Sequence, residues 1–596
     1  MAAIVRRAFW FPLIIGFMAP IRAFAGASPP VILITIDTLR ADRVGCYGDE
    51  KASTPTLDQL AREGEIFDRL YAPAPLTLPS HASLMTGLQP SRHGIRDNGG
   101  FQLDPAVTTL AQRFHAGGYA TGAFVSGMPL KRGSGIERGF DVYDDRLDPG
   151  REGLERSAPD TIGRALSWLK TIRQAAEQRP FFLWVHLYEP HSPYRPPEAF
   201  AETWKNDLYR GEIAFVDSQV GLFFETLRKQ GIYDRAVVAV VGDHGEGLGD
   251  HGEARHGVLL YEETVRAPAI LKASMLPRDL RGVVDRTPLS MADFSSSLLS
   301  LSGLSVPEGL DGRIRPLPGR STGDGPIPIE SAFPALHFGW SPLFGVVDGK
   351  WKLISGPDPE LYDLIADPHE RHNLVKLEER VYRRLSAWLA SYQKSVPANG
   401  WKSRRSDLAV DPRLRSLGYL TGSEGSPVDY QKDPKAWIEI VNRREEGEEA
   451  LANGDGMKAM KDFTLLMECD PDNYEALMAY ARSCELEGFD SIAILSYERA
   501  NFLRPTVLRV YDSLFTLRFG RGEYDQAEEK LKTALLLAPG HPKVLSTAAD
   551  FYHRMGRGAE ELSTLESLIE IQPNDQNVRE RFENAVAWES KRFRGR

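Results

Sequence analysis

Continuous apolar runs of five to seven residues recur through the first two thirds of the chain and indicate strands that are covered on both faces. These runs span 31–36, 181–187, 236–242 and 267–271. Helical patterns lie among them, at 55–63, 79–86, 158–170 and 211–229. The alternation extends from residue 28 to residue 420 and predicts an α/β domain, a class whose chemistry lies at the carboxyl ends of its strands.

The last third of the chain follows a 34-residue period instead. Three sets of positions keep that step: Pro471, Pro505, Pro539 and Pro573; Gly454, Gly488, Gly522 and Gly556; and Ala459, Ala493 and Ala527. Such spacing of turn glycines, helix-crossing alanines and helix-ending prolines is typical of tetratricopeptide repeats. We therefore predict an all-α solenoid over 434–596, with four repeats from about 440 to 575 and a polar capping helix from Gln576 onward. A Gly-, Ser- and Pro-rich linker over 421–433 is expected to precede it.

The first 27 residues are interpreted as a signal peptide rather than as part of the fold. A short basic region, Arg6-Arg7, precedes an apolar stretch over 8–19 that is too short to span a bilayer. Small residues around Ala25 and Ala27 fit a cleavage site. We expect an exported protein, periplasmic or secreted, and an uncleaved N-terminal membrane anchor is the alternative.

Composition narrows the class of protein further. The chain has 596 residues, a net charge of −10 and no long basic run, so nucleic acid is not expected as a partner. Its three cysteines, Cys46, Cys469 and Cys484, provide neither a disulfide framework nor zinc-finger spacing. We expect Cys469 and Cys484 to be buried free thiols, with a disulfide between them as the alternative.

Two of the predicted strands end in side chains that can bind a metal ion. The run 31–36 continues into Asp37, and the run 236–242 continues into Asp243 and His244. A carboxylate after an apolar strand is costly unless it is paired or binds a cation, although Asp37 taken alone fits a helix cap equally well. Oxygen ligands with one imidazole suit Mn²⁺, Zn²⁺, Ca²⁺ or Mg²⁺. One divalent metal ion is therefore predicted, and a hydrogen-bonded turn at Asp243 is the alternative.

A threonine lies close to the predicted start of a helix. Pro79 fits the first turn of that helix and Gly87 fits its end. Thr77 is therefore expected at the helix N-terminus, where backbone N–H groups and the helix dipole favour an anion. A hydroxyl in this place becomes a nucleophile only if its pKa is lowered, which a metal ion can do. Without that metal ion, Thr77 would simply cap the helix.

Three histidines follow the same predicted strands. His191 lies in Glu189-Pro190-His191 after the second apolar run, and His251 and His256 lie in the Gly-rich loop 245–257. Each of them, taken singly, fits an ordinary core or loop histidine. Together they favour a site that binds an oxyanion and protonates a leaving group.

Several motifs, in the right order over residues 30–400, resemble the sulfatase family of the alkaline phosphatase superfamily. They are Ile34-Thr35-Ile36-Asp37-Thr38-Leu39-Arg40-Ala41-Asp42, Leu78-Pro79-Ser80-His81-Ala82-Ser83-Leu84-Met85-Thr86-Gly87, Glu189-Pro190-His191, Gly242-Asp243-His244-Gly245-Glu246, and Glu360-Leu361-Tyr362-Asp363-Leu364 with 367–374. The resemblance implies an alkaline phosphatase/sulfatase-like mixed sheet sandwiched by helices over 28–420. It also implies a C-terminal subdomain at about 340–400.

The chain departs from the sulfatase motifs at three places. The family's Cys or Ser, which is converted to formylglycine, is Thr77 here, and threonine cannot give that aldehyde by the same conversion. The motif's Arg is His81. The family's Gly-Lys-Trp-His segment should follow 118–121, where this chain has Phe124-Val125-Ser126-Gly127-Met128 instead.

Threonine is the nucleophile in a neighbouring branch that includes lipoteichoic acid synthases and phosphoethanolamine transferases. These enzymes hold one metal ion through an acidic residue, the threonine, an aspartate and a histidine. The matching residues here are Asp37, Thr77, Asp243 and His244. Asn98 resembles the phosphate-contacting Asn of phosphonate monoester hydrolases, and His256 stands where many sulfatases have a Lys. We expect Asn98, His81 and His251 to contact the substrate.

The expectation is a metal-dependent ester hydrolase or transferase in which Thr77 attacks a phosphoester or phosphodiester and forms a phospho-threonine. His191 or His256 would assist the leaving group. A sulfate-ester hydrolase without formylglycine and a catalytically weak interaction scaffold are the alternatives. The repeats are expected to bind a protein or peptide partner or to mediate self-association, and a purely stabilising role is the alternative.

Overall fold

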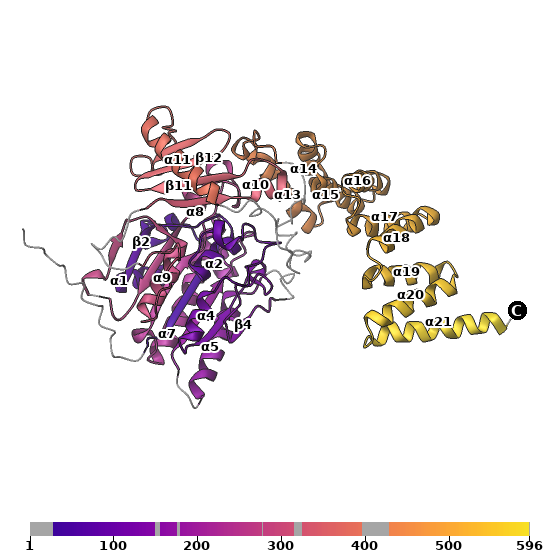
Figure 1. Cartoon of the computed structure of the whole chain (residues 1–596), viewed down its shortest axis with the longest axis horizontal. Coiled ribbons are helices and arrows are strands. Elements are labelled where there is room, and N and C mark those ends of the chain that lie inside the picture. The colour runs from indigo at the N-terminus through magenta and orange to yellow at the C-terminus, as the bar shows by residue number, and fades with distance from the viewer. Residues whose placement is uncertain are drawn as a thin grey trace, which may run out of the picture.

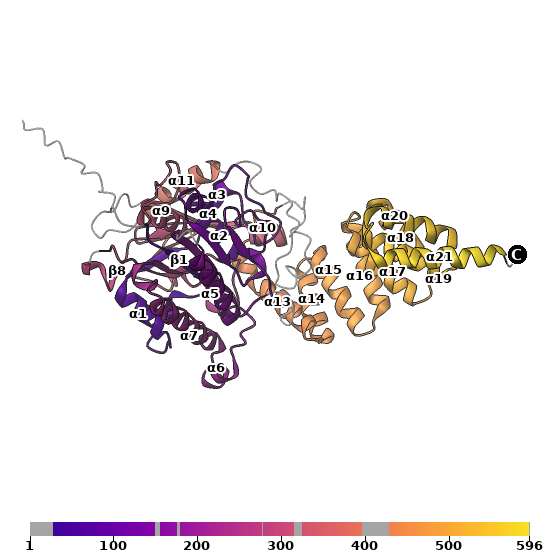
Figure 2. The ribbon, with the colours of Figure 1, turned by 90° about the horizontal axis from the view of Figure 1, so that it is seen from below.

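A computed structural model describes residues 28–148, 155–175, 179–276, 278–314, 325–395 and 428–594. The predicted signal peptide and residues 421–427 of the predicted linker lie outside these ranges. An α/β body occupies one end of the molecule, and an array of helices extends from it to the C-terminus (Figures 1 and 2). Among the described residues, no helix is both long enough and apolar enough to cross a membrane.

A mixed sheet of nine strands forms the centre of the α/β body, in the order β4-β3-β5-β1-β6-β7-β2-β8 with β9 beside β2. The strands are β1 (Val31–Ile36), β2 (Glu65–Tyr71), β3 (Ala120–Phe124), β4 (Val142–Asp144), β5 (Phe181–Leu187), β6 (Val237–Gly242), β7 (Arg266–Lys272), β8 (Val283–Asp285) and β9 (Leu289–Ser290). β1 pairs in parallel with β5 and with β6, so the carboxyl ends of these three strands lie together. β7 runs antiparallel to both of its neighbours, β6 and β2.

Side chains of β1 alternate between two cores, one on each face of the sheet, as the pleat of a strand requires. Val31 and Leu33 belong to the core built with α2 (Thr77–Thr86), α4 (Leu110–Ala116) and α9 (Met291–Leu301). Ile32 and Ile34 belong to the core built with α1 (Pro55–Glu63), α5 (Ala158–Gln174) and α7 (Leu208–Lys229). Shorter helices are α3 (Pro90–His93), α6 (Glu198–Thr203), α8 (Glu262–Val265) and α10 (Phe333–Phe338). Both faces of the sheet are therefore covered, which is why its central strands are mostly apolar, with Thr35 and His186 as buried polar exceptions.

A second, antiparallel sheet of four strands lies beside the large one (Figure 1). Its strands are β10 (Ile327–Ser331), β11 (Leu343–Asp348), β12 (Trp351–Ser355) and β13 (Glu360–Asp363), and α11 (Glu379–Ser395) packs against them. The resemblance placed this subdomain at about 340–400, whereas the sheet begins upstream because β10 pairs with β11. A backbone bond from Glu330 N to Pro73 O, 2.8 Å long, ties β10 to the body.

The C-terminal array consists of paired helices whose turns repeat the 34-residue step. A 3-10 turn (Pro434–Trp437) leads into α13 (Ile438–Ala452) and α14 (Gly456–Cys469), α15 (Tyr474–Leu486) and α16 (Asp490–Leu503), α17 (Leu508–Gly520) and α18 (Tyr524–Leu537), α19 (Pro542–Arg554) and α20 (Gly558–Ile571), and finally α21 (Gln576–Arg594). The four periodic glycines have φ between +67° and +77°, the left-handed region that favours glycine. The three periodic alanines are fully buried where helices meet.

These elements confirm the predicted fold class, an α/β body with a mixed sheet followed by an all-α repeat array. α2 begins at Thr77 rather than at Pro79, so the threonine is itself the first helical residue.

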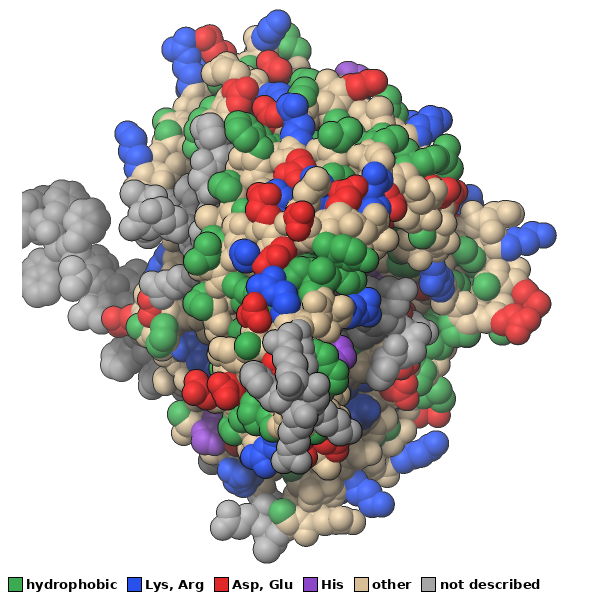
Figure 3. All heavy atoms as spheres, turned by 90° about the vertical axis from the view of Figure 1, so that its right-hand side faces the viewer, with side chains coloured by type: hydrophobic (Ala, Val, Ile, Leu, Met, Phe, Trp, Pro, Cys, Tyr) green, Lys and Arg blue, Asp and Glu red, His purple; other side chains and the backbone are tan. Residues whose placement is uncertain are grey.

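Both Cys469 and Cys484 are free thiols, and Cys484 is buried as predicted. The prediction that Cys469 is buried was wrong, because this residue ends α14 and faces solvent. Figure 3 views the molecule from the side where the array lies, and acidic and basic side chains are interspersed over that face.

Candidate active site and metal centre

Asp37, Asp243 and His244 come together where β1 and β6 end, and Thr77 lies beside them at the start of α2. His244 Nε2 is 3.5 Å from Asp37 Oδ1 and 3.7 Å from Asp243 Oδ2. The same nitrogen is 3.5 Å from Thr77 Oγ1. All four side chains are buried. The fold therefore brings the four predicted metal ligands into one cluster from three separate segments of the chain.

Backbone hydrogen bonds orient the Asp243 carboxylate. Its Oδ1 accepts from Thr38 N at 3.1 Å and from His244 N at 2.8 Å, which leaves Oδ2 on the side of the His244 ring. Thr38 has a φ of +50°, a costly conformation for a β-branched residue. Its hydroxyl donates to Pro190 O, which helps to hold the turn. The strained turn after Asp37 is what directs the Thr38 N–H toward the second carboxylate.

The tautomer of His244 follows from its own hydrogen bond. Nδ1 lies 2.9 Å from Gly245 O, and because a carbonyl oxygen only accepts, Nδ1 carries the proton. The lone pair is therefore on Nε2, which points at the two carboxylates. A backbone carbonyl on the far nitrogen is the usual partner of a metal-binding histidine. Burial also lowers the pKa of His244 well below its ordinary value, which keeps the ring neutral.

The donor set fits a divalent cation. Both carboxylate oxygens of Asp37 and Oδ2 of Asp243 are buried without a hydrogen-bond partner in the described part of the chain. Burial raises the pKa of both carboxyl groups well above the ordinary value, so this pair stays ionised only beside a positive charge. Ligands at about 2.1 Å from a tetrahedral ion lie about 3.4 Å apart, and the separations of 3.5 and 3.7 Å match that geometry.

Asn98 leaves an unused donor beside Thr77. Its Oδ1 accepts from Leu78 N at 2.7 Å, which settles the orientation of the amide. Its Nδ2 is buried and has no hydrogen-bond partner among the described residues. Because α2 begins at Thr77, its N-terminal dipole also favours negative charge at this point. The arrangement is suited to hold an oxyanion next to the threonine hydroxyl.

His191 and His256 form the next layer around the cluster. Their ring centroids are 5.3 Å apart, and His256 is 4.6 Å from the His244 ring. His256 Nδ1 lies 3.0 Å from Glu246 Oε1, while His191 Nδ1 donates to Ser192 O at 2.6 Å. Burial lowers the pKa of each imidazole to about 3, so both rings are neutral in the absence of substrate.

His81, in contrast, is committed to protein partners on both ring nitrogens. Nδ1 donates to Thr77 O at 2.8 Å, and Nε2 accepts from Thr35 Oγ1 at 3.0 Å. Trp184 Nε1 donates in turn to the same hydroxyl at 2.9 Å. These three hydrogen bonds connect the backbone carbonyl of Thr77 to β1 and β5. The geometry therefore suits a positioning role for His81 better than the predicted contact with substrate.

His251 faces another set of partners. Its Nδ1 is 2.6 Å from Glu263 Oε1, and its Nε2 is 3.4 Å from Glu370 O. Its ring stacks on Tyr261 with centroids 3.7 Å apart. Burial alone would lower the pKa of His251, but the Glu263 carboxylate raises it, which favours the charged ring beside that carboxylate. The predicted substrate contact by His251 stays a prediction, with its polar atoms already engaged.

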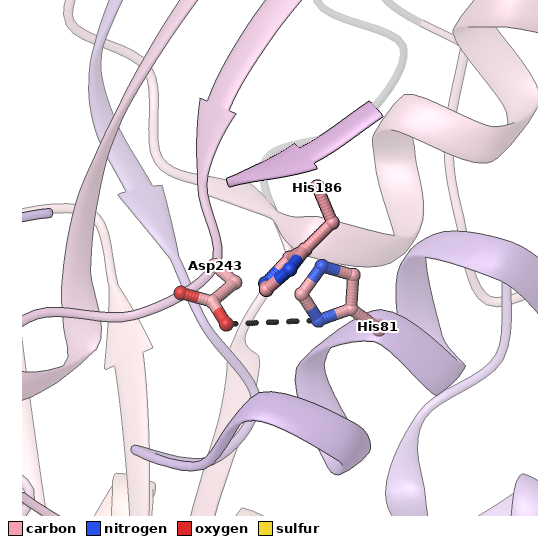
Figure 4. A group of neighbouring side chains, drawn as sticks. All are labelled: His81, His186 and Asp243. Carbon is pink, nitrogen blue, oxygen red and sulfur yellow. Dashed lines mark ion pairs between the residues drawn. The ribbon is translucent and has the colours of Figure 1, made fainter. Parts of the chain in front are cut away.

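Sequence reasoning missed His186, the second-to-last residue of β5 (Figure 4). His186 Nε2 is 3.5 Å from Asp37 Oδ2, and it is buried without a hydrogen-bond partner in the described part of the chain. His81, His186 and Asp243 offer ligand atoms within 4.8 Å of one another. The available signal was a single histidine inside an otherwise apolar strand.

The first helix of the repeat array reaches the loop that carries His256. On α13, Asn442 donates to Gly252 O at 2.7 Å and accepts from Ala254 N at 3.0 Å. Val441 on the same helix is 2% exposed and joins the core formed by 258–260. The array is therefore packed onto the active-site loop rather than suspended from the body.

Arg255 adds a charged link at the same junction. It forms ion pairs with Glu445 at 3.6 Å and with Glu449 at 3.0 Å, both on α13. Because Arg255 directly precedes His256, the two acidic residues of the array hold the backbone of the histidine from outside the site.

Replacing Asn442 by alanine is expected to lower kcat/KM by about 3- to 10-fold, because two hydrogen bonds worth about 1 kcal/mol each hold the loop. The measurement is steady-state kinetics of the full chain on an ester substrate. Glu439→Gln, a change on the exposed side of α13, serves as the matched control and should leave kcat/KM unchanged. Equal kinetics for Asn442→Ala and the control would show that α13 does not position the loop.

Known proteins share both parts of this architecture. A model of the sulfatase family matches residues 29–304, and a tetratricopeptide-repeat model matches residues 518–580. An arylsulfatase of Clostridium perfringens is 24% identical over 448 residues, which cover 59% of this chain and 91% of that protein.

Two solved structures share the fold of the α/β body. One is a protein in complex with its substrate D-glucosamine-2-N,6-O-disulfate, at a TM-score of 0.54 and 18% identity, covering 63% of this chain and 100% of the other. The second is the phosphonate monoester hydrolase of Agrobacterium radiobacter, at a TM-score of 0.51 and 22% identity, covering 62% and 96%. At these identities the likeness concerns the fold alone.

Proposed function

We propose that this chain, which carries a sulfatase-family domain of the alkaline phosphatase superfamily followed by tetratricopeptide repeats, is a metal-dependent ester hydrolase or transferase that favours phosphoesters or phosphodiesters. The observation that carries the proposal is the position of the Thr77 hydroxyl, 3.5 Å from His244 Nε2 within the cluster of Asp37, Asp243 and His244. A hydroxyl at a cation site and a helix N-terminus is suited to attack an anionic ester.

In the proposed reaction, Thr77 Oγ attacks phosphorus in line with the leaving oxygen. The bond between Oγ and phosphorus forms as the bond to the leaving oxygen breaks, which gives a phospho-threonine. A divalent ion held by Asp37, Asp243 and His244 would lower the pKa of the hydroxyl and offset the charge on the transferring group. Asn98 Nδ2 donates to a non-bridging oxygen, and water or an acceptor alcohol then releases the group from Thr77.

A bound anionic ester would raise the pKa of His191 or His256, so that one ring takes up a proton from solvent and then gives it to the leaving oxygen. The His256 ring lies 4.6 Å from the His244 ring and 5.3 Å from the His191 ring, so both histidines are close to the cluster. General acids of this kind contribute about 10²- to 10⁴-fold to a rate. The contribution falls when the leaving group is already a stable anion.

Replacing His191 by alanine should therefore reduce kcat/KM about 100-fold for an alkyl phosphoester and less than about tenfold for a p-nitrophenyl ester. The measurement is the slope of log kcat/KM against leaving-group pKa, which should steepen in the variant. The same substrate series on His256→Ala shows which of the two histidines is the general acid, because only loss of that residue should steepen the slope. Identical slopes for the wild type and both variants would remove general acid catalysis by these residues.

The proposed substrate class is tested with matched esters. p-Nitrophenyl phosphate, bis-p-nitrophenyl phosphate, p-nitrophenyl phenylphosphonate and p-nitrophenyl sulfate share one leaving group, so their kcat/KM values compare the transferred group directly. We expect a phosphorus ester to be the best substrate. Turnover of the sulfate ester alone would contradict the phosphoester proposal and favour a sulfate-ester hydrolase.

That competitor is a sulfate-ester hydrolase without formylglycine. The relatives favour this activity, because the match to the arylsulfatase of Clostridium perfringens covers 91% of that protein. The phosphonate monoester hydrolase among the structural neighbours supports the phosphorus chemistry instead. A weakly catalytic scaffold is the third candidate. The carboxylate oxygens of Asp37 and Oδ2 of Asp243 speak against it, because they are buried without a hydrogen-bond partner among the described residues.

We further propose that the protein acts outside the cytoplasm and that its repeat array binds a protein or peptide partner or mediates self-association. Export is supported by the sequence of residues 1–27, which lie outside the described residues. Cleavage between residues 20 and 30, read by N-terminal sequencing of the mature protein, tests it. Retention of Met1 would favour the membrane-anchored alternative.

A further inference from the structure

We propose that His337, on α10 of the C-terminal subdomain, is a positioning residue for Asn98 and acts on it through the carboxylate of Asp97. This role deepens the proposed function and rests on it, because Asn98 has to be the oxyanion donor beside Thr77. His337 and Asp97 are 240 residues apart in sequence, so the contact joins the subdomain to the catalytic site.

Asn98 lies in a segment whose position is not set by a helix or a strand. Residues 94–109, all of which the structure describes, connect α3 to α4 without regular secondary structure. Arg96, Asp97 and Asn98 are nevertheless at most 2% exposed. Buried backbone outside helices and strands must find its hydrogen-bond partners elsewhere, side chains among them. The position of Asn98 therefore depends on side-chain contacts.

The Asp97 carboxylate connects Asn98 to α10. Its Oδ1 accepts from Asn98 N at 2.7 Å, and His337 Nε2 donates to its Oδ2 at 2.7 Å. The side chains of His337 and Asp97 are 1% and 2% exposed. Each carboxylate oxygen is thus engaged, one by the backbone of Asn98 and the other by the imidazole. Loss of the imidazole contact frees the carboxylate to turn, which disturbs the backbone at Asn98.

Asn98 is held both at its backbone and at its side chain. Asp97 Oδ1 accepts from its backbone N–H, and its side-chain Oδ1 accepts from Leu78 N at 2.7 Å. These contacts leave Nδ2 for a ligand, since it is buried without a hydrogen-bond partner among the described residues. A donor that is aimed before the ligand arrives needs no reorganisation during the reaction. The contact from His337 helps to supply that aim.

The residue before Asp97 is also attached to the subdomain. Arg96 forms an ion pair with Glu330 of β10, and the two side chains are 0% and 4% exposed. Removing one partner of a buried ion pair leaves the other charge uncompensated, so such a pair resists separation. Two successive positions before Asn98 are therefore fixed to β10 and α10.

α10 is packed in turn against the first helix of the repeat array. Phe333 stacks on the His337 ring with centroids 4.0 Å apart, and the Arg444 guanidinium of α13 lies 5.4 Å from the ring centroid of Phe338. Phe333, Phe338 and Val441 of α13 belong to one core. Because a helix of six residues is not stable alone, these contacts are what keep His337 in place.

The competing explanation is a pair of residues that only stabilises the fold. Loss of such a pair would lower the melting temperature, and its effect on catalysis would be independent of Asn98. A positioning residue behaves differently, because its effect disappears once the residue that it positions has been removed. A double-mutant cycle separates the two explanations.

The test combines His337→Leu with Asn98→Ala in the full chain, using the ester that the wild type cleaves best. We expect His337→Leu to lower kcat/KM about 10-fold when Asn98 is present, and less than about twofold when residue 98 is already alanine. His337→Gln, whose amide can still donate to Asp97, should stay within about threefold of the wild type. His337→Asn, whose amide is too short to reach Asp97, should behave as His337→Leu does.

The affinity for inorganic phosphate gives a readout that does not require turnover. Titration calorimetry on the full chain should show phosphate binding weakened about 5- to 10-fold by His337→Leu and by Asn98→Ala, and no further in the double variant. His115→Leu is the matched control, because it removes an exposed histidine–aspartate contact, His115 Nε2 to Asp141 Oδ1 at 3.2 Å. It should change neither measurement. Circular dichroism checks that each variant folds.

The outcomes separate the role of His337 from the proposed function. Equal effects of His337→Leu with and without Asn98, or unchanged kcat/KM in both His337→Leu and His337→Asn, overturn the positioning role alone. No effect of Asn98→Ala on turnover or phosphate affinity overturns the oxyanion role of Asn98 and the role of His337 with it. If the wild type cleaves no ester, the proposed function fails and the phosphate affinities decide. A His337 effect that requires Asn98 and is rescued by His337→Gln establishes His337 as a positioning residue.

Discussion

Thr77→Ala is expected to lower kcat/KM by at least about 10³-fold, since removal of a nucleophile leaves only binding and electrostatic contributions. The variant keeps the cluster of Asp37, Asp243 and His244, so metal content should fall far less than activity. Rapid-quench kinetics on the wild type should show a burst of released leaving group. Intact mass after an acid quench should show one phosphoryl group on the chain, located at Thr77 by peptide mapping.

Thr77→Ser is the matched control for this result. It keeps the hydroxyl and removes one buried methyl group, which costs about 0.8 kcal/mol of stability at this fully buried position. We expect the serine variant to retain measurable turnover and to form the same covalent adduct on the new hydroxyl. Full activity of Thr77→Ala, or an adduct on any other residue, would contradict the proposed mechanism.

Asp243→Asn is expected to abolish turnover and to weaken metal binding by more than the roughly 10- to 100-fold that follows loss of a residue that only orients a ligand. The amide can keep the Oδ1 contacts with Thr38 N and His244 N, so the fold is preserved while the charged ligand is lost. Saturating metal should stabilise the wild type by about 2.7 kcal/mol at 100 times its Kd, and it should leave the variant unchanged.

The effect of Asp243→Asn on thermal stability is expected to change sign when metal is removed. Burial raises the pKa of Asp243 in the folded chain, so its carboxylate destabilises the metal-free protein at neutral pH. In the presence of a chelator, Asp243→Asn should therefore melt at a higher temperature than the wild type. Asp217→Asn is the control, since Asp217 is buried but caps α1 through Thr56 N and Leu57 N, and it should keep the metal response. A metal response in Asp243→Asn would rule out this carboxylate as a ligand.

The sequence predicted the parts of the fold that depend on local pattern. β5 coincides with the predicted run 181–187 because a strand covered on both faces is apolar at nearly every position, His186 being the exception. The repeat helices follow the 34-residue step because each turn requires glycine in a left-handed conformation. The predicted ligands Asp37 and Asp243 could be singled out for a related reason, since charged residues at the ends of apolar strands are rare without a partner.

The remaining features depend on contacts between distant segments. His186 looked like an ordinary core residue until β1 placed Asp37 Oδ2 opposite its free nitrogen. His251 lies near His256 in sequence, and the contacts of its ring with Glu263 and Glu370 come from distant segments. Contacts between residues that are distant in sequence follow no periodic pattern, so they cannot be predicted from local sequence.

The docking of α13 on the loop before His256 joins the repeat array to the candidate active site. Asn442 and two glutamates of α13, Glu445 and Glu449, contact the loop that carries His256. A molecule that binds the array and shifts α13 must alter the affinity for substrate. Reciprocity then requires substrate to alter the affinity of the array for that molecule by the same factor. The repeats would thus serve as an allosteric input to ester cleavage.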